Sequence, residues 1–388
     1  MSDKLHVCVD KQETGVLLKE DDEYIFSYSS DDPMHFISLT MPPRQKDYVH
    51  HTLHPIFEMH LPEGYLLSII KKHFSKILKL DAMGLLSLMS KSIYGRVTYT
   101  TQNEVASETL SLQELLHPKD EKLFNELVSR FALHSALSGV QPKVLALVQD
   151  KASLRLEQYI VKSWGDDYPQ LALNEYYCMR VALLSGLEVA DFHLSDDDRL
   201  FIMKRFDLLD SGASLGFEDM CVLQAKQSDE KYIGTYESIA KTIKSFVSPK
   251  HKRRALQDFF KMLVVNTLVQ NGDAHLKNFG LLYKNKEDIW LAPAYDIVST
   301  TVYINNDIAA LNLMGSKKWW SQKALTNFAQ QNCSLSLQEA RKIYLQTFNA
   351  LQKVIHEIQE RLISEKESSK QQVLKAMLTT FKEATCHS

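Results

Sequence analysis

The first hundred residues alternate short apolar runs with polar turns. Runs with the length and period-two alternation of β-strands lie at residues 5–9, 15–18, 24–28, 36–40 and 96–100. Residues 64–80 instead follow a helical period, which places on one face Leu67, Ile70, Phe74, Ile77 and Leu78. The pattern predicts a small α+β unit that spans residues 1–110.

The pattern changes beyond a polar stretch at residues 107–122. Strand-like runs occupy residues 138–149, 154–164 and 199–209, and an amphipathic helix is predicted at residues 174–189. Beyond residue 230 the period becomes helical, at residues 235–247, 252–270, 336–360 and 371–382. We therefore predict a strand-rich lobe at residues 125–230 and a helical lobe at residues 231–388. This is the order of a bilobal protein kinase.

Composition narrows the class of protein without revealing its chemistry. The 388 residues carry a net charge of −3, with 45% hydrophobic and 24% charged residues, as in ordinary soluble globular proteins. No apolar run approaches the ~20 residues of a membrane span, and the N-terminus lacks an apolar signal core. Five scattered cysteines without a C-x-x-C pair are typical of reduced thiols. We expect a cytoplasmic protein with no membrane partner, although the sequence leaves secretion into a host open.

The most informative stretch is NGDAHLKNF at residues 271–279, just past an apolar helix. It places Asp273 five residues before Asn278. Phosphoryl transfer uses such a pair on one short loop, with a carboxylate to orient the attacking hydroxyl and an amide oxygen to hold Mg²⁺. Asp296 follows a predicted strand–turn–strand segment, where a protein kinase has its other metal carboxylate. The constellation predicts an ATP-dependent kinase.

Ordinary structure also explains parts of this stretch. Asn-Gly is a strong hairpin signal, and Gly272 is suited to cap the preceding helix. An aspartate and an asparagine at this spacing also arise by chance. The buried helix before the loop, the hairpin after it and the second acid favour catalysis over these alternatives.

Three further residues fit a kinase only in the context of this loop. Lys162 ends a predicted strand, as the phosphate-pairing lysine of kinases does, and Glu175 lies early in the next helix, in reach of an ion pair. A lysine that points into water and a glutamate favoured by the helix dipole are the alternatives. Phe206 is either an adenine-side residue or a core phenylalanine. The segment SGVQPK at residues 138–143 has one glycine, so an ordinary turn explains it without a phosphate.

Together these motifs resemble those of the HipA-like serine/threonine kinases, the toxins of bacterial type II toxin–antitoxin systems. The resemblance spans essentially the whole chain and is densest at residues 138–300. SGVQPK is similar to the family's S/A-G-x-Q-x-K loop, and LPEG, GLLSL and YGRV resemble its small N-terminal subdomain, which some relatives encode as a separate protein. The fold implied is α+β, bilobal and protein-kinase-like, with a strand-rich, nucleotide-binding N-lobe at residues 125–230 and an all-helical C-lobe with the catalytic loop at residues 231–388.

The resemblance implies roles for particular residues. Asp273 matches the catalytic aspartate and Lys162 the ATP-binding lysine, while Asn278 and Asp296 match the two metal ligands. The nucleotide-binding residues implied are Ser138, Gly139, Gln141, Lys143, Lys162, Phe206, His275, Lys277 and Tyr295. Residues 218–223 match a segment near the substrate side. The cofactors implied are ATP and Mg²⁺.

The sequence departs from the family at two positions. The family often inactivates itself by phosphorylating a serine that corresponds here to Ala136. Ser138 is therefore the candidate autophosphorylation site, unless self-inactivation is missing. Lys204 stands where an acidic residue is common, so the adenine pocket is expected to differ in detail.

The resemblance also implies partners. The substrate expected is a translation component such as an aminoacyl-tRNA synthetase, and the partners are a HipB-like helix-turn-helix antitoxin or a HipS-like protein. This chain has no helix-turn-helix signal, so DNA contact is expected only through the antitoxin. Two alternatives remain, a phosphotransferase for a small-molecule hydroxyl such as an aminoglycoside, and a nucleotide-binding regulatory module without catalysis. The intact Asp273, Asn278 and Asp296 argue against the second.

Overall fold

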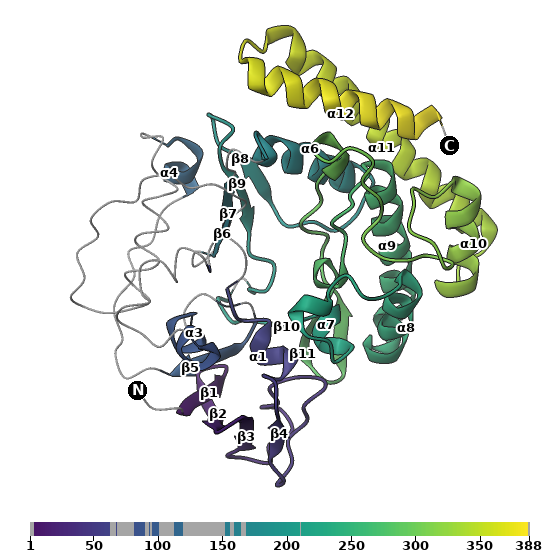
Figure 1. Cartoon of the computed structure of the whole chain (residues 1–388). Helices are drawn as coiled ribbons and strands as arrows, with labels where there is room; N and C mark the ends of the chain where they lie inside the picture. Colours follow the sequence, from purple (N-terminus) through teal and green to yellow (C-terminus); the bar gives the residue numbers. More distant parts are fainter. Residues whose placement is uncertain are drawn as a thin grey trace.

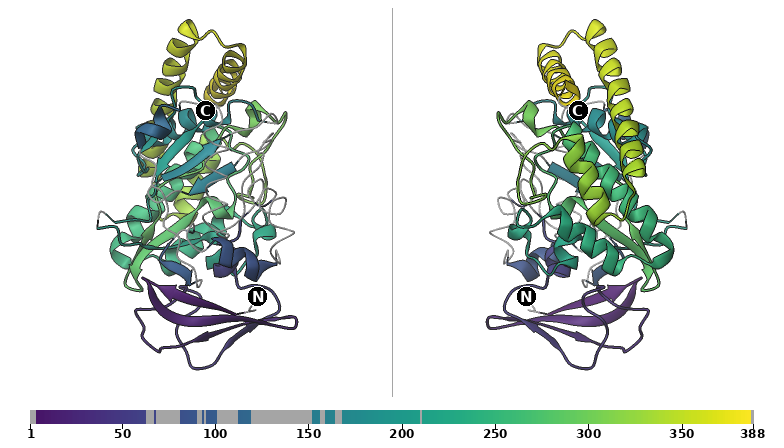
Figure 2. Two further views of the ribbon diagram at one scale, coloured as in Figure 1. Left: turned by 90° about the vertical axis from the view of Figure 1, so that its left-hand side faces the viewer. Right: turned by 90° about the vertical axis from the view of Figure 1, so that its right-hand side faces the viewer.

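The structure is a computed structural model. It describes residues 4–62, 67, 81–89, 93, 95–100, 112–118, 152–155, 159–163, 168–209 and 211–386. A strand-rich unit near the N-terminus and a pair of C-terminal helices lie at opposite ends of the molecule, with two further sheets and the remaining helices between them (Figures 1 and 2). The helix predicted at residues 64–80 lies outside the described residues, except for Leu67, which is helical.

The N-terminal unit is an antiparallel sheet with the strand order β4-β3-β2-β1-β5. Its strands are β1 (Lys4–Val9), β2 (Gln12–Glu20), β3 (Glu23–Tyr28), β4 (Tyr48–His50) and β5 (Val97–Thr100). Asp10 and Lys11 have φ angles of 52° and 67°, the left-handed values that a two-residue hairpin turn requires. The helices of this part of the chain are α1 (Pro55–Glu58), α3 (Ala82–Met89) and α4 (Leu112–Leu116).

The strand predicted at residues 36–40 is wrong. The segment is a bend with an isolated bridge between Ser38 and Met41. Phe36 and Ile37 are both buried, but Phe36 stacks on Tyr283 of the helical part, whereas Ile37 belongs to the core of the N-terminal unit. The apolar run therefore reflects a segment that crosses between two cores, and not a strand in a sheet.

The second sheet is antiparallel, with the order β6-β7-β9-β8. Its strands are β6 (Ala152–Arg155), β7 (Tyr159–Ser163), β8 (Phe192–Leu194) and β9 (Phe201–Lys204). Helix α6 (Leu171–Leu184) packs against β7 and β9. It begins earlier than predicted and ends before Gly186, whose φ of 78° suits the position after a helix.

The helical body packs around one buried helix, α9 (Pro249–Leu268). Five of its residues have no exposed surface, namely Phe259, Phe260, Leu263, Val264 and Val265. The other helices are α7 (Met220–Leu223), α8 (Tyr236–Phe246), α10 (Gln322–Asn332), α11 (Leu337–Ser364) and α12 (Ser368–Cys386). Among the described residues, no helix is both long and apolar enough to cross a bilayer.

A third sheet lies within this helical part, with the order β10-β11-β12, so the expectation of an all-helical C-lobe is wrong in this detail. Its strands are β10 (Gly216–Asp219), β11 (Gly280–Asn285) and β12 (Asp288–Leu291), and β11 and β12 form the hairpin that the sequence predicts. The loop between α9 and β11 is therefore held between a buried helix and a sheet strand. This is the loop with the sequence NGDAHLKNF.

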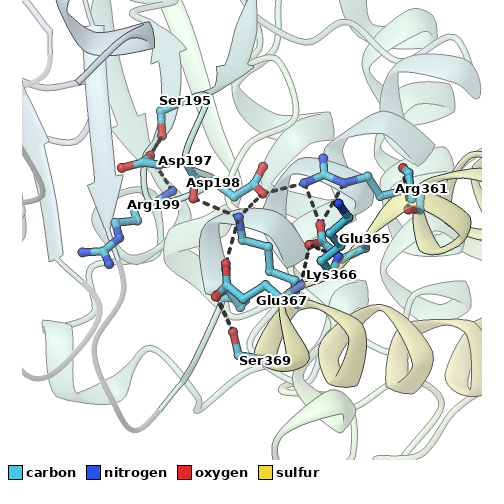
Figure 3. Close-up of polar contacts among 12 residues, drawn as sticks. Ser195, Asp197, Asp198, Arg199, Arg361, Glu365, Lys366, Glu367 and Ser369 are labelled. Atoms are coloured by element: carbon cyan, nitrogen blue, oxygen red, sulfur yellow. Dashed lines mark hydrogen bonds and ion pairs between the residues drawn. The ribbon is translucent and has the colours of Figure 1, made fainter. Parts of the chain in front are cut away.

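A charge network joins the C-terminal helix pair to the second sheet (Figure 3). Asp198, in the turn between β8 and β9, is buried and lies 2.6 Å from Nη2 of Arg361 and 2.7 Å from Nζ of Lys370. Arg361 lies in the last turn of α11 and Lys370 near the start of α12. The corner between these helices therefore holds the sheet that carries Lys162, because a buried carboxylate needs its partners.

Glu218 of β10 holds the N-terminal unit against the helical body. It is fully buried and accepts hydrogen bonds from the Ser38 hydroxyl at 2.8 Å, the Leu39 amide at 2.7 Å and the Tyr283 hydroxyl at 2.8 Å. Burial raises the pKa of Glu218 to about 7, although these donors act in the opposite direction. The junction therefore contains a carboxyl group that keeps its proton in weak acid.

We predict that Glu218→Gln flattens the pH dependence of the free energy of unfolding. Because the pKa of Glu218 rises from 4.5 to about 7 on folding, the unfolded chain loses the proton in this window while the folded chain keeps it. The stabilisation is therefore fully present below pH 4.5 and is lost as the pH rises through 7. Urea unfolding should show wild type losing up to about 1.4 kcal/mol per pH unit relative to the variant. Parallel profiles would contradict this assignment.

Candidate active site

The loop after α9 is shaped by two asparagines at the end of the helix. Gln270 has a left-handed φ of 54°, which turns the chain away from the helix axis. Asn271 is buried, and its Nδ2 donates to Oδ1 of Asn266 at 2.8 Å while its Oδ1 accepts from the Asp273 amide at 3.1 Å. These bonds satisfy polar groups that the helix end would otherwise leave buried, and they fix the backbone that carries Asp273.

Gly272 is required by a close approach. A Cβ atom there would lie 2.0 Å from Oδ2 of Asp307, and the Gly272 amide donates to the Thr300 hydroxyl at 2.8 Å. The Thr300 hydroxyl in turn donates to Asp307 at 2.5 Å. Gly272 is therefore neither part of a hairpin turn nor the left-handed residue of the helix end, which is Gln270. The two alternatives from the sequence do not describe this glycine.

Four side chains from four segments meet beside this loop. Nζ of Lys162, on β7, lies 2.5 Å from Oε1 of Glu175 on α6 and 2.8 Å from Oδ1 of Asp296. Nδ2 of Asn278 donates to Oδ2 of Asp296 at 2.8 Å. Lys162 is 7% exposed and Glu175 is 1% exposed, so neither points into water. Buried charges need partners of the opposite sign, and these three ionised groups supply them to one another.

Asp296 takes its place in this cluster through an uncommon backbone conformation. Its φ is 56°, in the left-handed region that few residues other than glycine adopt, and aspartate is among those that tolerate it. The turn follows β12 and directs the carboxylate back toward β7 and the loop. Such strain persists where surrounding contacts fix a functional side chain.

Asn278 and Asp296 offer the donor set of a magnesium site that also uses phosphate oxygens. The Oδ1 atom of Asn278 accepts one hydrogen bond, from the His275 amide at 2.9 Å, and an amide oxygen has a second lone pair. The described residues contain no group of three or more His, Cys, Asp or Glu side chains suited to hold a metal. Mg²⁺ is usually held by one or two protein oxygens together with waters and substrate phosphates, so the pair fits this ion.

Asp273 faces the outer side of the loop. Its side chain is 34% exposed. Its Oδ1 accepts a hydrogen bond from the Tyr232 hydroxyl at 2.6 Å and lies 3.8 Å from Nε2 of His275. The Tyr232 ring packs edge-on against His275, with centroids 4.9 Å apart. No motif in the sequence points to Tyr232, because a tyrosine outside any motif gives no signal of its neighbours in space.

Phe206 lies just past the end of β9 and stacks on Tyr295, with ring centroids 5.3 Å apart and planes at 25°. The residues on either side of Phe206 form a buried ion pair, in which Arg205 donates to Asp207 at 3.0 and 2.6 Å. Asp207 also accepts from the Gly95 amide at 2.8 Å. Residues 205–207 are therefore hydrogen-bonded to the N-terminal unit through Asp207, while the Phe206 ring stacks on Tyr295.

Of the remaining predicted residues, Lys277 lies within the described part of the chain and the positions at residues 136–143 lie outside it. The Lys277 ammonium donates to the Ser228 hydroxyl at 3.0 Å, and the Lys277 carbonyl accepts from the Tyr295 hydroxyl at 2.8 Å. The backbone at Lys277 thus links Asn278, the candidate metal ligand, to the stacked rings of Phe206 and Tyr295. Other predicted positions lie outside the described residues, namely Ala136, Ser138, Gly139, Gln141 and Lys143.

Comparison with known proteins finds two matching family models. The HipA-like C-terminal domain matches residues 135–355, and the HipA N-terminal domain matches residues 5–100. The candidate kinase Y4dM of Sinorhizobium fredii is 32% identical over 52% of this chain and 54% of its own length. The serine/threonine-protein kinase toxin HipA of Shewanella oneidensis is 27% identical over 43% of this chain and 44% of its own. The chain thus spans about half the length of the curated relatives it matches.

A solved structure covers nearly the whole chain. HipA of Shewanella oneidensis, in complex with HipB and its operator DNA, superposes with a TM-score of 0.70. The superposition covers 98% of this chain and 97% of that chain at 16% identity. At this identity the similarity concerns the fold, and it confirms the predicted bilobal, kinase-like α+β class.

We predict that Gly272→Ala destabilises the protein through its contact with Asp307. The new methyl group would lie 2.0 Å from the carboxylate, and overpacking of this kind costs about 1–3 kcal/mol. Asp307→Ala removes the obstructing oxygen, so the double variant should lose less stability than the sum of the single variants. Chemical denaturation of all four proteins measures this coupling. Additive losses would show that the close approach does not fix Gly272.

Proposed function

The chain belongs to the HipA family, and from this premise we propose that it is an ATP-dependent serine/threonine protein kinase. The observation that carries the proposal is the buried cluster of Lys162, Glu175 and Asp296, with Asn278 and Asp273 on the adjoining loop. A lysine paired with a helix glutamate, together with a loop aspartate, a loop asparagine and a second acid, has the parts that protein kinases use for phosphoryl transfer.

ATP would bind with its adenine beside Phe206 and its phosphates toward Lys162. The stacked Phe206 and Tyr295 offer an aromatic wall, and Arg205 and Asp207 hold that wall in place. Lys162 contacts Asp296 at 2.8 Å, so phosphates that enter here compete with the carboxylate for the same ammonium. Mg²⁺ held by Asn278 and Asp296 would supply positive charge to the phosphate oxygens.

Asp273 would orient the hydroxyl of the acceptor and receive its proton. A bond forms between the acceptor oxygen and the γ-phosphorus, the bond from that phosphorus to the bridging oxygen of ADP breaks, and the acceptor proton passes to the Asp273 carboxylate. General-base help of this kind contributes roughly 10²- to 10⁴-fold. The exposed side of Asp273 faces solvent, where a protein acceptor has access.

The family premise extends the proposal to partners. A HipB-like antitoxin is proposed because the HipA of Shewanella oneidensis was solved with HipB and operator DNA, and a HipS-like protein is the other candidate. We propose that DNA contact comes through the antitoxin, and that the substrate is a translation component such as an aminoacyl-tRNA synthetase in the cytoplasm. Self-phosphorylation at Ser138 and domain boundaries near residues 110 and 230 belong to the same proposal.

We predict that Asp273→Ala and Asp296→Ala separate catalysis from nucleotide binding. Both should lower phosphoryl transfer from ATP at least ~10²-fold. Only Asp296→Ala should also weaken ATP binding that depends on Mg²⁺. Among the described residues, the Asp273 carboxylate contacts Tyr232 and His275, whereas Asp296 contacts Lys162 and Asn278. Titration calorimetry with and without Mg²⁺ measures the binding. Asp22→Ala, in an exposed turn of the N-terminal unit, is the control.

The acceptor class is tested with radiolabelled ATP and a bacterial lysate. A labelled protein band that disappears with Asp273→Ala supports a protein kinase. Label found only in small molecules indicates the alternative phosphotransferase. Tight ATP binding with no label in any acceptor indicates a nucleotide-binding module. Equal loss of Mg²⁺-dependent ATP affinity in both variants would contradict the division of roles between the two aspartates.

A further inference from the structure

The segment at residues 227–233, between α7 and α8, lies against the catalytic loop. It contains a short 3₁₀ turn, Ser228–Glu230. The Tyr232 hydroxyl donates to Oδ1 of Asp273 at 2.6 Å, and the Ser228 hydroxyl accepts from the Lys277 ammonium at 3.0 Å. Two hydroxyl groups of one segment thus engage two side chains of the loop. We call residues 227–233 the covering segment.

Backbone contact holds the covering segment in register with the loop. The Leu276 amide donates to the Lys231 carbonyl at 3.1 Å. Gly234, just past the segment, faces Leu276, because a Cβ atom there would lie 3.3 Å from Cδ2 of that leucine. These contacts therefore hold the backbone on either side of Tyr232 beside the loop, and the Tyr232 side chain reaches Asp273 from there.

The hydrogen bond from Tyr232 to Asp273 is the bond that an acceptor hydroxyl has to make. A catalytic aspartate in phosphoryl transfer accepts a hydrogen bond from the attacking hydroxyl at about 2.6–3.2 Å. The Tyr232 hydroxyl occupies Oδ1 of Asp273 within this range. A carboxylate oxygen accepts more than one hydrogen bond, but a serine or threonine hydroxyl that approaches Oδ1 has to share this position with the Tyr232 hydroxyl. Tyr232 is 43% exposed, so it can leave without opening the core.

The N-terminal unit anchors the other side of the covering segment. The Ser228 amide donates to Oε2 of Glu58 at 2.9 Å. The Gln227 side chain donates to the Leu53 carbonyl at 3.2 Å and to the Thr52 hydroxyl at 3.3 Å. Glu58, Leu53 and Thr52 all belong to the N-terminal unit around α1. The segment is therefore tethered between this unit and the loop.

We infer that Tyr232 is an internal occupant of the acceptor position, held at Asp273 by a segment anchored on the N-terminal unit. The inference rests on the proposed kinase function and adds a gate to it. A protein acceptor binds only when Tyr232 has left Asp273, so the apparent affinity for the acceptor falls by the fraction of molecules in which the position is open. Tyr232→Phe keeps the ring that packs on His275 and changes no residue of the cluster around Lys162, so nucleotide binding should stay unchanged.

The test is steady-state transfer from radiolabelled ATP by wild type and Tyr232→Phe, with dephosphorylated casein as the acceptor. A hydrogen bond to a charged group shifts an equilibrium by roughly 10- to 100-fold. Water replaces part of this bond at an exposed site, so we expect the KM for casein to fall roughly 3- to 10-fold. The kcat and the KM for ATP should stay unchanged. Transfer to water in the absence of casein should rise by a similar factor.

Two further variants separate gating from a structural effect. Glu58→Ala removes an anchor of the covering segment without touching the loop, so it should lower the KM for casein in the same direction. Tyr24→Phe, in β3 of the N-terminal sheet, is a matched loss of a tyrosine hydroxyl and should leave all constants unchanged.

The outcomes distinguish this inference from the proposed function. If wild type transfers label to casein and Tyr232→Phe has the same KM, the gate does not exist. A fall in kcat with unchanged KM would make Tyr232 a helper of Asp273, which also overturns the inference. If wild type binds ATP but labels neither casein nor water nor any lysate protein, the proposed kinase function fails and the gate fails with it.

Discussion

The contact of Lys162 with Glu175 and Asp296 is the constraint on which the arrangement of the site depends. The three charges come from a strand, a helix and the segment after a hairpin, and Lys162 and Glu175 are almost completely buried. Removing one partner from such a cluster costs about 3–5 kcal/mol, because the remaining charge stays in a medium of low polarity. β7, α6 and the Asp296 turn are therefore held together. The Asp198 network at the α11–α12 corner holds the β8–β9 turn of the same sheet.

None of the four side chains of this cluster comes from the N-terminal unit, yet described residues of that unit contact the surroundings of the cluster. Loop residues Ser38 and Leu39 bind Glu218, and Gly95 binds Asp207 beside Phe206. Glu58 holds the covering segment, which carries Tyr232 to Asp273. The unit is thus in contact with both the proposed adenine side and the proposed acceptor side. A change in the position of the N-terminal unit is therefore expected to alter both the adenine side and the acceptor side.

The sequence predicts the fold well where a local pattern decides the structure. α9 and the β11–β12 hairpin were predictable because each buries a continuous apolar stretch, and the loop between them stands out as polar. Residues 36–40 were mistaken for a strand, because burial between two cores imitates alternation. α10 was missed, although Leu325, Phe328 and Ala329 follow a helical period after the capping Ser321.

The candidate site shows which functional residues a local sequence pattern can predict and which it cannot. Lys162, Glu175, Asn278 and Asp296 were selected by chemistry and order along the chain, and the structure brings these four into contact while their roles stay predictions. Tyr232 and Asp207 could not be selected, since Asp273 and Gly95, with which they form hydrogen bonds, lie far away in the sequence. The most direct test of the account is a crystal structure with Mg²⁺ and a non-hydrolysable ATP analogue. We expect a cation bound to oxygens of Asn278 and Asp296, with Lys162 in contact with a phosphate. A nucleotide bound elsewhere, with Lys162 still held by both carboxylates and no cation between Asn278 and Asp296, would contradict it.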